Sequence, residues 1–536
     1  MIRPRFWIAA LLAGCLAAPV WADAAPTDAA QRSREDARAL AAKIDRFIAA
    51  RLAAEKVTPA PVADDGAYLR RLSLDVIGRI PSVSETRRFL RDPGSIKREQ
   101  SIERLLDSPG YVTNFSNIWR DLLLPEANAD FQQRFLSANI ERWLRKEFAD
   151  NVPYDRMVRE LITLPMQSNR QNMFYNLRTG APSPLAFYMS KQGKPENLAA
   201  TTSRLFLGVR LECAQCHNHP FGRWTREQFW GQAAFFGGIR SQGNNNNPFA
   251  PLSEVANRRE LAIPGTERVV QARFLDGKEP VWRYKADTRN TLADWMTAAD
   301  NPFFAKAAVN RLWAHFFGVG IVEPVDDFSD KNQPSHPELL DELARQFASH
   351  GFDYRFLIRA ITLSKTYQLS SVHPESTPPD VQLFARMPVK GLSQDQLYES
   401  LIVATGTPNP NANQRRFAFN SPQNIFQAKF TNQEKRTEYQ TSIPQALALM
   451  NSKMIADATH PQRSEFLAAV TNAPFLDTAG RIETLYLATL SRKPRAEELE
   501  HFRRYIEKGG AAKDPKTALA DVFWALLNST EFFLNH

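Results

Sequence analysis

The sequence predicts a mainly α-helical protein, built as two helical domains joined by a short irregular, β-containing linker. First, apolar residues recur at spacings of three and four through most of the chain, as they do on the buried face of a helix. Second, residues 241–285 break this pattern. Third, a length of 536 residues exceeds what one ordinary hydrophobic core supports, so more than one domain is expected.

We place the first helical domain at residues 30–240. Ala29–Lys56 is rich in Ala, Arg, Glu and Leu, and Phe131–Asn151 carries one apolar face, so both segments predict long helices. Pro153 opens a further predicted helix, because proline is tolerated in a first helical turn. Glu196–Val209 predicts a helix that leads directly into a pair of cysteines.

The linker at residues 241–285 is followed by a second helical domain at residues 286–536. The linker contains four consecutive asparagines and β-prone pieces such as Val269–Phe274, which indicate loops and short strands. Ser335 and Glu338 have capping-box spacing, which predicts a helix start. The helical pattern of this domain covers Ala286–Ala298, Phe303–Phe317, the segment through His350, Phe356–Leu369, Ile443–Ala456, Ile482–Leu490, Ala496–Lys508 and Thr517–Leu534.

Composition is typical of a soluble globular protein and gives no sign of nucleic-acid binding. Hydrophobic residues make up 43% of the chain and charged residues 23%, which excludes disorder of the whole chain. The formal net charge is +9, but the basic residues are interspersed with acids and form no basic arm. We expect the basic pairs to lie on solvated helix faces; they include Arg70-Arg71, Arg87-Arg88, Arg258-Arg259 and Arg415-Arg416.

Residues 1–22 have the pattern of a signal peptide, which predicts export. A positively charged start precedes an apolar run, Phe6–Val20, that is shorter than the roughly 20 residues needed to span a bilayer. Alternatively, Leu12–Cys15 matches a bacterial lipobox, in which Cys15 would carry a lipid and provide the link to a membrane. We therefore expect a periplasmic or cell-envelope protein, either soluble or lipid-anchored.

The motif that carries chemistry is Cys213-Ala-Gln-Cys216-His217. It occurs once and uses both cysteines that remain after residues 1–22. In c-type cytochromes, two thiols on one turn of chain add to the vinyl groups of haem, and the next histidine binds the iron. Covalent haem attachment takes place in exported proteins. The leading interpretation is therefore haem c, held by Cys213 and Cys216, with His217 as the iron ligand.

Three other interpretations of the motif remain open. Cys213 and Cys216 could form a reversible redox disulfide, although the segment before them is helical and not part of a βαβ unit. They could bind zinc with His217 and His219, with a distant histidine completing the site, because zinc sites usually draw ligands from two segments. The two cysteines could also form a local structural disulfide.

A haem iron needs a sixth ligand or an open distal side, and no residue has diagnostic spacing for that role. Acidic residues in one loop could bind a cation or a sugar, although capping of neighbouring helices explains them more simply. The sequence lacks a nucleophile elbow, a zincin helix, a phosphate-binding loop and a Rossmann fingerprint, so enzymatic activity stays open. The candidate sixth ligands are Met166, Met173, Met189, His219, His315 and His336, and the acidic loop contains Glu323, Asp326, Asp327 and Asp330.

Several longer stretches resemble the planctomycete-type cytochrome-c-associated tandem of unknown-function domains, a PSCyt-like N-terminal domain followed by a PSD-like C-terminal domain. They occur in family order and cover nearly all of the chain after residue 22. The first domain's stretches are Leu205–Phe221, Trp224 and Ala233–Phe236, and the second domain's are Asn301–Ala305, Asn310–Gly318, Pro324–Asp327, Pro334–Leu340, Pro444–Ser452 and Trp524–Ser529.

The resemblance implies tandem, mainly helical, exported domains with a link to cytochromes, but no defined reaction. The chain has Asn218 and Gly222 where relatives often have acidic residues, and it lacks the separate N-terminal cytochrome c domain that many relatives carry. We therefore expect a c-type haem protein in electron transfer or redox chemistry, partnered by a redox protein or a secreted enzyme. The alternative is a non-redox envelope scaffold or polysaccharide-associated protein, with a structural disulfide or zinc at the cysteine motif.

Overall fold

The structure is a computed structural model of the chain. It describes residues 28–125, 131–166, 181–219, 222–241, 250–255, 257–283, 287–407 and 452–536, with the backbone alone for residues 131–136. The expected signal peptide and lipobox fall outside these residues, as do Met173 and Arg415-Arg416. Among the described residues, no helix is both long and apolar enough to cross a membrane.

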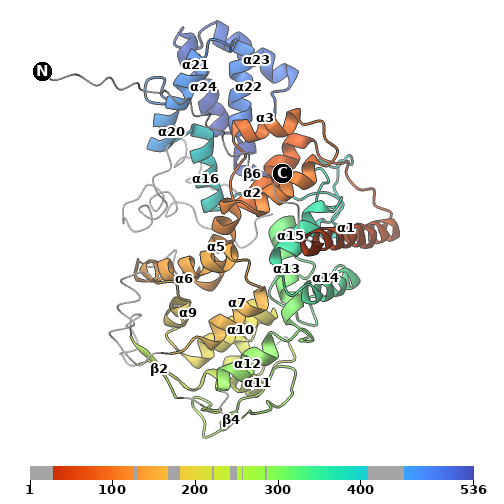
Figure 1. Cartoon of the computed structure of the whole chain (residues 1–536), viewed down its shortest axis with the longest axis vertical. Coiled ribbons are helices and arrows are strands. Elements are labelled where there is room, and N and C mark those ends of the chain that lie inside the picture. The colour runs from red at the N-terminus through yellow and green to blue at the C-terminus, as the bar shows by residue number, and fades with distance from the viewer. Residues whose placement is uncertain are drawn as a thin grey trace, which may run out of the picture.

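The fold is mainly α-helical, as predicted, with twenty α-helices among the described residues (Figure 1). The first part of the chain contains ten of them and two short 3-10 helices. Their bounds are α1 (Asp28–Glu55), α2 (Asp65–Ile77), α3 (Val83–Arg91), α4 (Lys97–Leu106), α5 (Pro109–Leu123), α6 (Phe131–Ala149), α7 (Tyr154–Thr163), α9 (Leu185–Ser190), α10 (Pro195–Leu207), η2 (Glu212–Gln215), α11 (Arg226–Ala233) and η3 (Ala234–Phe236).

Short strands follow α11, which agrees with the predicted β content of the linker. They form two antiparallel pairs of three residues per strand. One pair is β1 (Ile239–Ser241) with β2 (Leu252–Glu254), and the other is β3 (Glu260–Ala262) with β4 (Val269–Gln271).

The second part of the chain is again helical and ends in a small strand that returns to β5. This strand, β6, pairs antiparallel with β5, so that Lys390 lies opposite Asn535. The bounds are α12 (Thr288–Met296), α13 (Phe304–Phe317), α14 (Pro337–Ser349), α15 (Tyr354–Leu363), η4 (Val381–Leu383), β5 (Lys390–Gly391), α16 (Gln394–Thr405), α20 (Lys453–Ala458), α21 (Glu465–Asn472), α22 (Thr478–Thr489), α23 (Ala496–Glu507), α24 (Pro515–Leu527), η6 (Thr530–Phe533) and β6 (Leu534–Asn535).

Local sequence explains where several of these helices begin and end. The Thr225 side chain accepts from the third residue of α11 in a complete capping box, and α10 ends at Gly208 with a left-handed φ of 65°. The capping box predicted for α14 from Ser335 and Glu338 is wrong. The residue before this helix is His336, which makes no side-chain cap, and the Ser335 hydroxyl instead donates to the Ile321 carbonyl at 3.2 Å.

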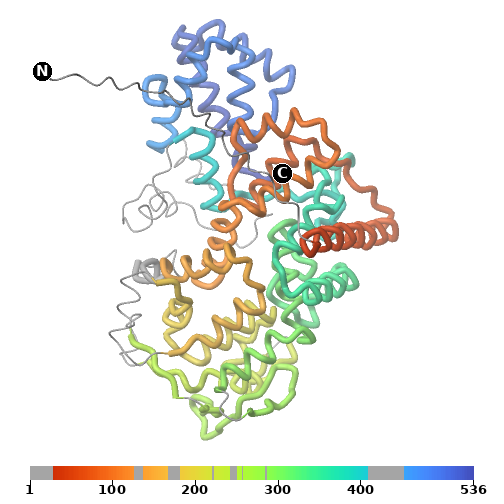
Figure 2. Tube along the Cα trace, in the orientation of Figure 1, coloured from red at the N-terminus to blue at the C-terminus, as the bar shows by residue number. Residues whose placement is uncertain are grey.

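Two hydrophobic cores hold the molecule together, and each uses residues from both sides of the 241–285 linker. The larger core runs from Ala37 to Met387, and the smaller one joins Leu74 and Ile80 to the C-terminal helices. Figure 2 shows the consequence in space: α1 lies beside α14 and α15, and the last helices gather next to α2 and α3. The N- and C-terminal parts of the chain are therefore intertwined through shared cores.

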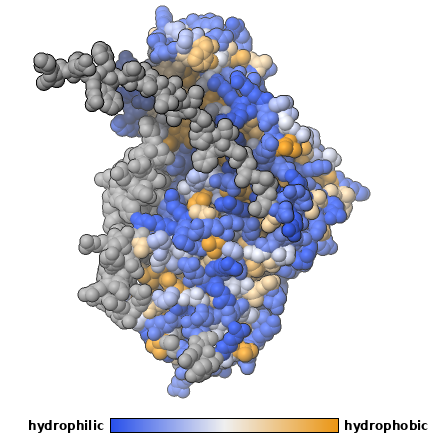
Figure 3. Space-filling model, viewed as in Figure 1, coloured by the Kyte–Doolittle hydropathy of each residue, from blue (hydrophilic) through white to orange (hydrophobic). Residues whose placement is uncertain are grey.

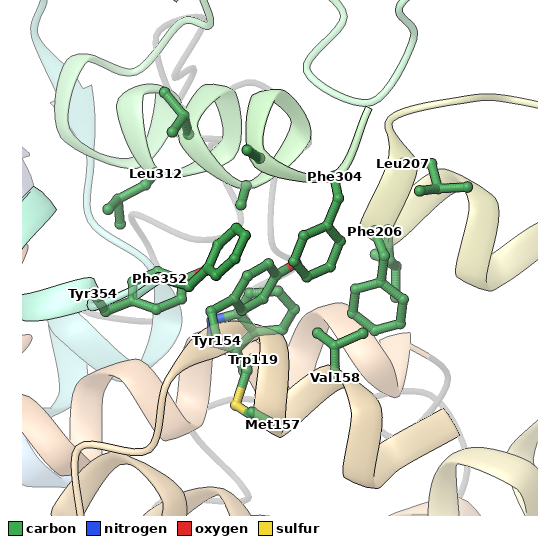
Figure 4. Close-up of a cluster of buried hydrophobic side chains, with 14 of the residues drawn as sticks. Trp119, Tyr154, Met157, Val158, Phe206, Leu207, Phe304, Leu312, Phe352 and Tyr354 are labelled. Carbon is green, nitrogen blue, oxygen red and sulfur yellow. The ribbon is translucent and has the colours of Figure 1, made fainter. Parts of the chain in front are cut away.

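Aromatic side chains form the centre of the larger core (Figure 4). Tyr154 of α7 stacks on Phe304 of α13, with ring centroids 4.9 Å apart. Trp119 of α5 stacks on Phe206 near the end of α10, at 6.3 Å. The last turn of α10 is thus fixed in the core directly before the cysteine motif. On the face seen in Figure 3, hydrophilic residues dominate and apolar ones are scattered.

Candidate functional site

The cysteine turn, residues 211–219, is a surface loop carried on the end of α10. Gly208 ends the helix, and the 3-10 turn η2 follows, with Cys216 still in a helical backbone conformation. Cys213 lies within η2, and Cys216 follows three residues later, directly after its last residue. Both cysteines are exposed and present separate thiols, while Ala214 between them is fully buried.

Helix α11 braces this turn from behind. The Gln215 carbonyl accepts a hydrogen bond from the Trp230 indole nitrogen at 3.0 Å and one from Arg226 Nε at 3.4 Å. The Asn218 side-chain oxygen accepts from the backbone N–H of Arg226 at 2.9 Å, at the first residue of the helix. Asparagine therefore supplies the acceptor that an acidic residue would supply at this position. These hydrogen bonds fix the backbone that carries the two thiols.

The two histidines of the turn differ in their surroundings. His217 is exposed, and its Nδ1 lies 2.7 Å from the Asn218 carbonyl oxygen, a contact that needs the proton on Nδ1. That tautomer leaves the Nε2 lone pair for a metal ion. His219 is half-buried, its backbone N–H donates to the Trp224 carbonyl at 2.8 Å, and its ring lies against Gly222. The structure thus fixes the tautomer of His217, and His219 contributes to the shape of the loop.

The acidic loop, residues 323–330, lies in the second half of the chain and contacts Gly208 and Arg210, directly before the cysteine turn. The Phe328 backbone N–H donates to the Gly208 carbonyl at 2.8 Å, and the Phe328 ring lies where a Cβ on Gly208 would be, 2.4 Å from its Cδ2. Asp326 Oδ1 accepts from Arg210 Nε at 2.9 Å and from Nη2 at 2.6 Å. The sequence suggested both segments as candidates, but only the structure brings them together.

These contacts also explain the charge state of the arginine. Burial lowers the pKa of Arg210, but the hydrogen bond and the negative charge of Asp326 outweigh it and raise that pKa overall. Arg204 Nη1 lies 3.5 Å from the other oxygen of Asp326. Two further acids of the loop have structural partners: Glu323 accepts from the Gly320 N–H at 2.9 Å, and Asp327 from Asn332 at 2.9 Å. Hydrogen bonds within the loop, rather than caps on neighbouring helices, therefore account for these two carboxylates.

The other candidate ligands that the structure describes are engaged in packing. Met189 is 2% exposed in the larger core, and Met166 packs against that core. His315 Nε2 lies 2.9 Å from the Asp75 carbonyl oxygen, with its ring against Phe115. His336 is buried, and burial lowers its pKa to about 4. In the part of the chain described, no three His, Cys, Asp or Glu side chains converge on a point that could hold a metal ion.

Comparison with known proteins identifies two consecutive families. Residues 43–241 match the PSCyt2 family, described as a protein of unknown function (DUF1549). Residues 288–441 match the PSD1 family, described as a protein of unknown function (DUF1553). The chain is a PSCyt2–PSD1 tandem protein. Searches of curated proteins and of solved structures found no match.

The Arg210–Asp326 and Gly208–Phe328 contacts cross the boundary between the two families. The cysteine turn belongs to the PSCyt2 region, and the acidic loop belongs to the PSD1 region. The Arg210–Asp326 and Gly208–Phe328 contacts therefore join the two family regions at the site. In this PSCyt2–PSD1 protein, the PSD1 region holds the backbone that enters the cysteine turn, while α11 of the PSCyt2 region holds the turn itself.

Sequence reasoning missed a second polar cluster, which lies at the junction between the two cores. Arg70 and Arg71 of α2 were expected on a solvated face, but both are 0% exposed. That expectation is wrong because their guanidinium groups donate to backbone carbonyls of distant segments, Arg70 to Phe532 at 2.8 Å and Arg71 to Leu369 at 2.9 Å. Burial lowers the pKa of Arg70 to about 10. The signal that could have been read was an arginine pair inside an otherwise apolar helix, with Asp75 one turn later.

Proposed function

We propose that the cysteine turn is a covalent haem attachment site and that the chain is an exported c-type haem protein in electron transfer or redox chemistry of the cell envelope. The observation that carries the proposal is the combination found on one short turn. Two exposed thiols lie three residues apart, one within a 3-10 turn and one directly after it, and the next residue is a histidine with Nδ1 engaged.

The donor set fits haem c in its chemistry. Cys213 and Cys216 would hold the porphyrin through thioether bonds, and His217 would bind the iron through Nε2. Haem would supply a one-electron carrier at this position. The thiols are open to the solvent, so a bulky planar group can reach them without unfolding the core. Ala214, buried between them, keeps the turn anchored.

The chain's own residues set the orientation of the ligand. The Asn218 carbonyl accepts a hydrogen bond from Nδ1–H of His217 and so fixes the ring and its tautomer. Trp230 and Arg226 hold the Gln215 carbonyl and prevent the turn from unwinding. Arg210, tied to Asp326, fixes the segment that enters the turn.

The second candidate is a non-redox envelope scaffold or polysaccharide-associated protein. Its motivating observation is that two exposed free thiols lie three residues apart in the chain, the spacing of C-x-x-C pairs that form disulfides. A zinc site would need further ligands, and the described residues bring none together with the cysteines. A redox partner protein or a secreted enzyme remains the proposed partner of either form.

The test is a pyridine haemochrome spectrum of the denatured protein, after expression with its own leader in a strain that matures c-type cytochromes. We expect a haem band that survives denaturation and is lost in Cys213→Ser/Cys216→Ser. His219→Ala is the matched control, because it removes a neighbouring imidazole and should keep the band. Folded protein without haem, whose two thiols titrate or form a disulfide, would favour the scaffold.

A further inference from the structure

The polar cluster at the junction of the cores contains three side chains that together can form a covalent bond. Asp75, Lys390 and Asn535 are each 0% exposed. Asp75 Oδ1 accepts a hydrogen bond from Lys390 Nζ at 2.8 Å and another from Asn535 Nδ2 at 2.8 Å. A primary amine, a carboxamide and a carboxyl group therefore meet in one buried site.

The backbone places the amine and the amide side by side. Lys390 and Asn535 lie directly opposite each other in the antiparallel pair of β5 and β6. Side chains at such positions leave the same face of the ladder, with Cβ atoms about 4.5–5.5 Å apart. Their nitrogen atoms bond the same carboxylate oxygen, so the two groups share one small volume.

The hydrogen bonding of the cluster leaves one atom unused. Asn535 Oδ1 is buried and accepts no hydrogen bond, although an orphaned buried carbonyl is costly. Asp75 Oδ2 accepts from the Tyr367 hydroxyl at 2.9 Å, and Lys390 Nζ also donates to the Phe316 carbonyl at 2.5 Å. The amide is thus the incompletely satisfied member, and its carbonyl carbon is the electrophile of the group.

We propose that Lys390 Nζ and Asn535 Cγ become joined in an intramolecular amide bond, with Asp75 as the acid–base group. The site is closed to solvent, and Lys390 Nζ donates a hydrogen bond to Asp75 Oδ1, so a proton can pass between these two groups during the reaction. Transfer of one proton from Lys390 to Asp75 therefore prepares both a nucleophile and an acid.

The reaction balances within these three side chains. The Nζ lone pair attacks Cγ of Asn535, while the Asp75 acid donates its proton to the amide as the C–N bond to Nδ2 weakens. Asp75 then takes the remaining proton from Nζ. The C–Nδ2 bond breaks, ammonia leaves, and an Nζ–Cγ amide remains beside a neutral Asp75. The step needs no oxidant or cofactor.

The bond would fix the C-terminal end of the fold to its middle. Lys390 lies shortly before α16, and Asn535 follows α24, so the link closes a loop around all the C-terminal helices. A covalent closure of this kind restricts the unfolded chain much as a disulfide does. The bond does not depend on haem, because it joins residues away from the cysteine turn.

The experiment is the intact mass of the purified full chain under denaturing conditions, followed by a tryptic map. We expect a mass about 17 Da below that of the processed sequence, the mass of one ammonia. We also expect the Lys390 and Asn535 peptides to appear as one linked species that trypsin does not cut at Lys390. The unmodified mass, with the two peptides separate, would overturn the proposal. So would a link to Asp75, which loses water instead, or a loss of ammonia located elsewhere.

Variants sharpen the assignment. Asp75→Asn and Lys390→Met should both restore the full mass, the first by removing the acid and the second by removing the nucleophile. Lys306→Met is the matched control, because Lys306 pairs with Asp341 at the surface. It should keep the deficit of about 17 Da. The wild-type map decides the question even where a core variant does not fold.

Discussion

Replacement of Gly208 by alanine tests the contact between the PSD1 loop and the end of α10, from which the chain enters the cysteine turn. Gly208 has a φ of 65°, and a Cβ there would lie 2.4 Å from the Phe328 ring. The left-handed backbone alone costs a non-glycine residue about 1 kcal/mol. Overpacking against the ring adds about 1–3 kcal/mol. Gly208→Ala should therefore lower the free energy of unfolding by about 2–4 kcal/mol, measured by urea denaturation.

Gly351 provides the matched control, because it has the same φ of 65° but no atom lies within 4 Å of the point that an added Cβ would occupy. Gly351→Ala should cost only the backbone term, about 1 kcal/mol. In a Phe328→Ala background, the stability lost through Gly208→Ala should fall to the same value, because the clash with the ring is gone. Equal destabilisation by the two alanine substitutions in the wild-type background would show that the Phe328 contact does not hold the end of α10.

Two further predictions concern single contacts. Asn218→Ala should lower the free energy of unfolding by about 1 kcal/mol, because the first N–H of α11 loses its acceptor. Asn218→Asp should keep that acceptor and the stability. Urea unfolding compares the two variants, and equal losses would contradict the capping role. Glu147 is 3% exposed, and burial followed by the charge of Glu160 raises its pKa to about 7. The folded protein then holds a proton that the unfolded chain releases. The free energy of unfolding should therefore fall by about 1–2 kcal/mol, after solvent screening, as the pH rises from about 5 to 8. Glu147→Gln should remove that pH dependence, and an unchanged stability–pH profile would refute it.

The helical class and the cysteine motif could be predicted from sequence because both are local signals. Apolar periodicity marks a helix wherever it is packed, and two cysteines and a histidine within five positions mark the motif. The local contacts of the motif are also close in sequence. Asn218 fixes the tautomer of His217, and α11, which bonds to Asn218, begins within ten residues of the motif.

The rest depends on long-range contacts that periodicity does not contain. Asp326 reaches Arg210 across 116 positions, and Lys390 reaches Asp75 across 315. Arg70 and Arg71 were misplaced for the same reason. A charged pair is expected in water unless distant carbonyls accept its hydrogen bonds, and those carbonyls belong to Phe532 and Leu369, far along the chain. The two hydrophobic cores each combine residues from before and after the linker, and local sequence patterns do not predict such long-range packing.

The most direct test of the central proposal is the ratio of covalently bound haem to protein in the purified, denatured chain. We predict one haem per chain in the wild type, none in Cys213→Ser/Cys216→Ser, and a normal ratio in His219→Ala. A folded wild-type chain that leaves a haem-maturing strain without haem would contradict the proposal, and would turn attention to the thiols of the cysteine turn as a dithiol site.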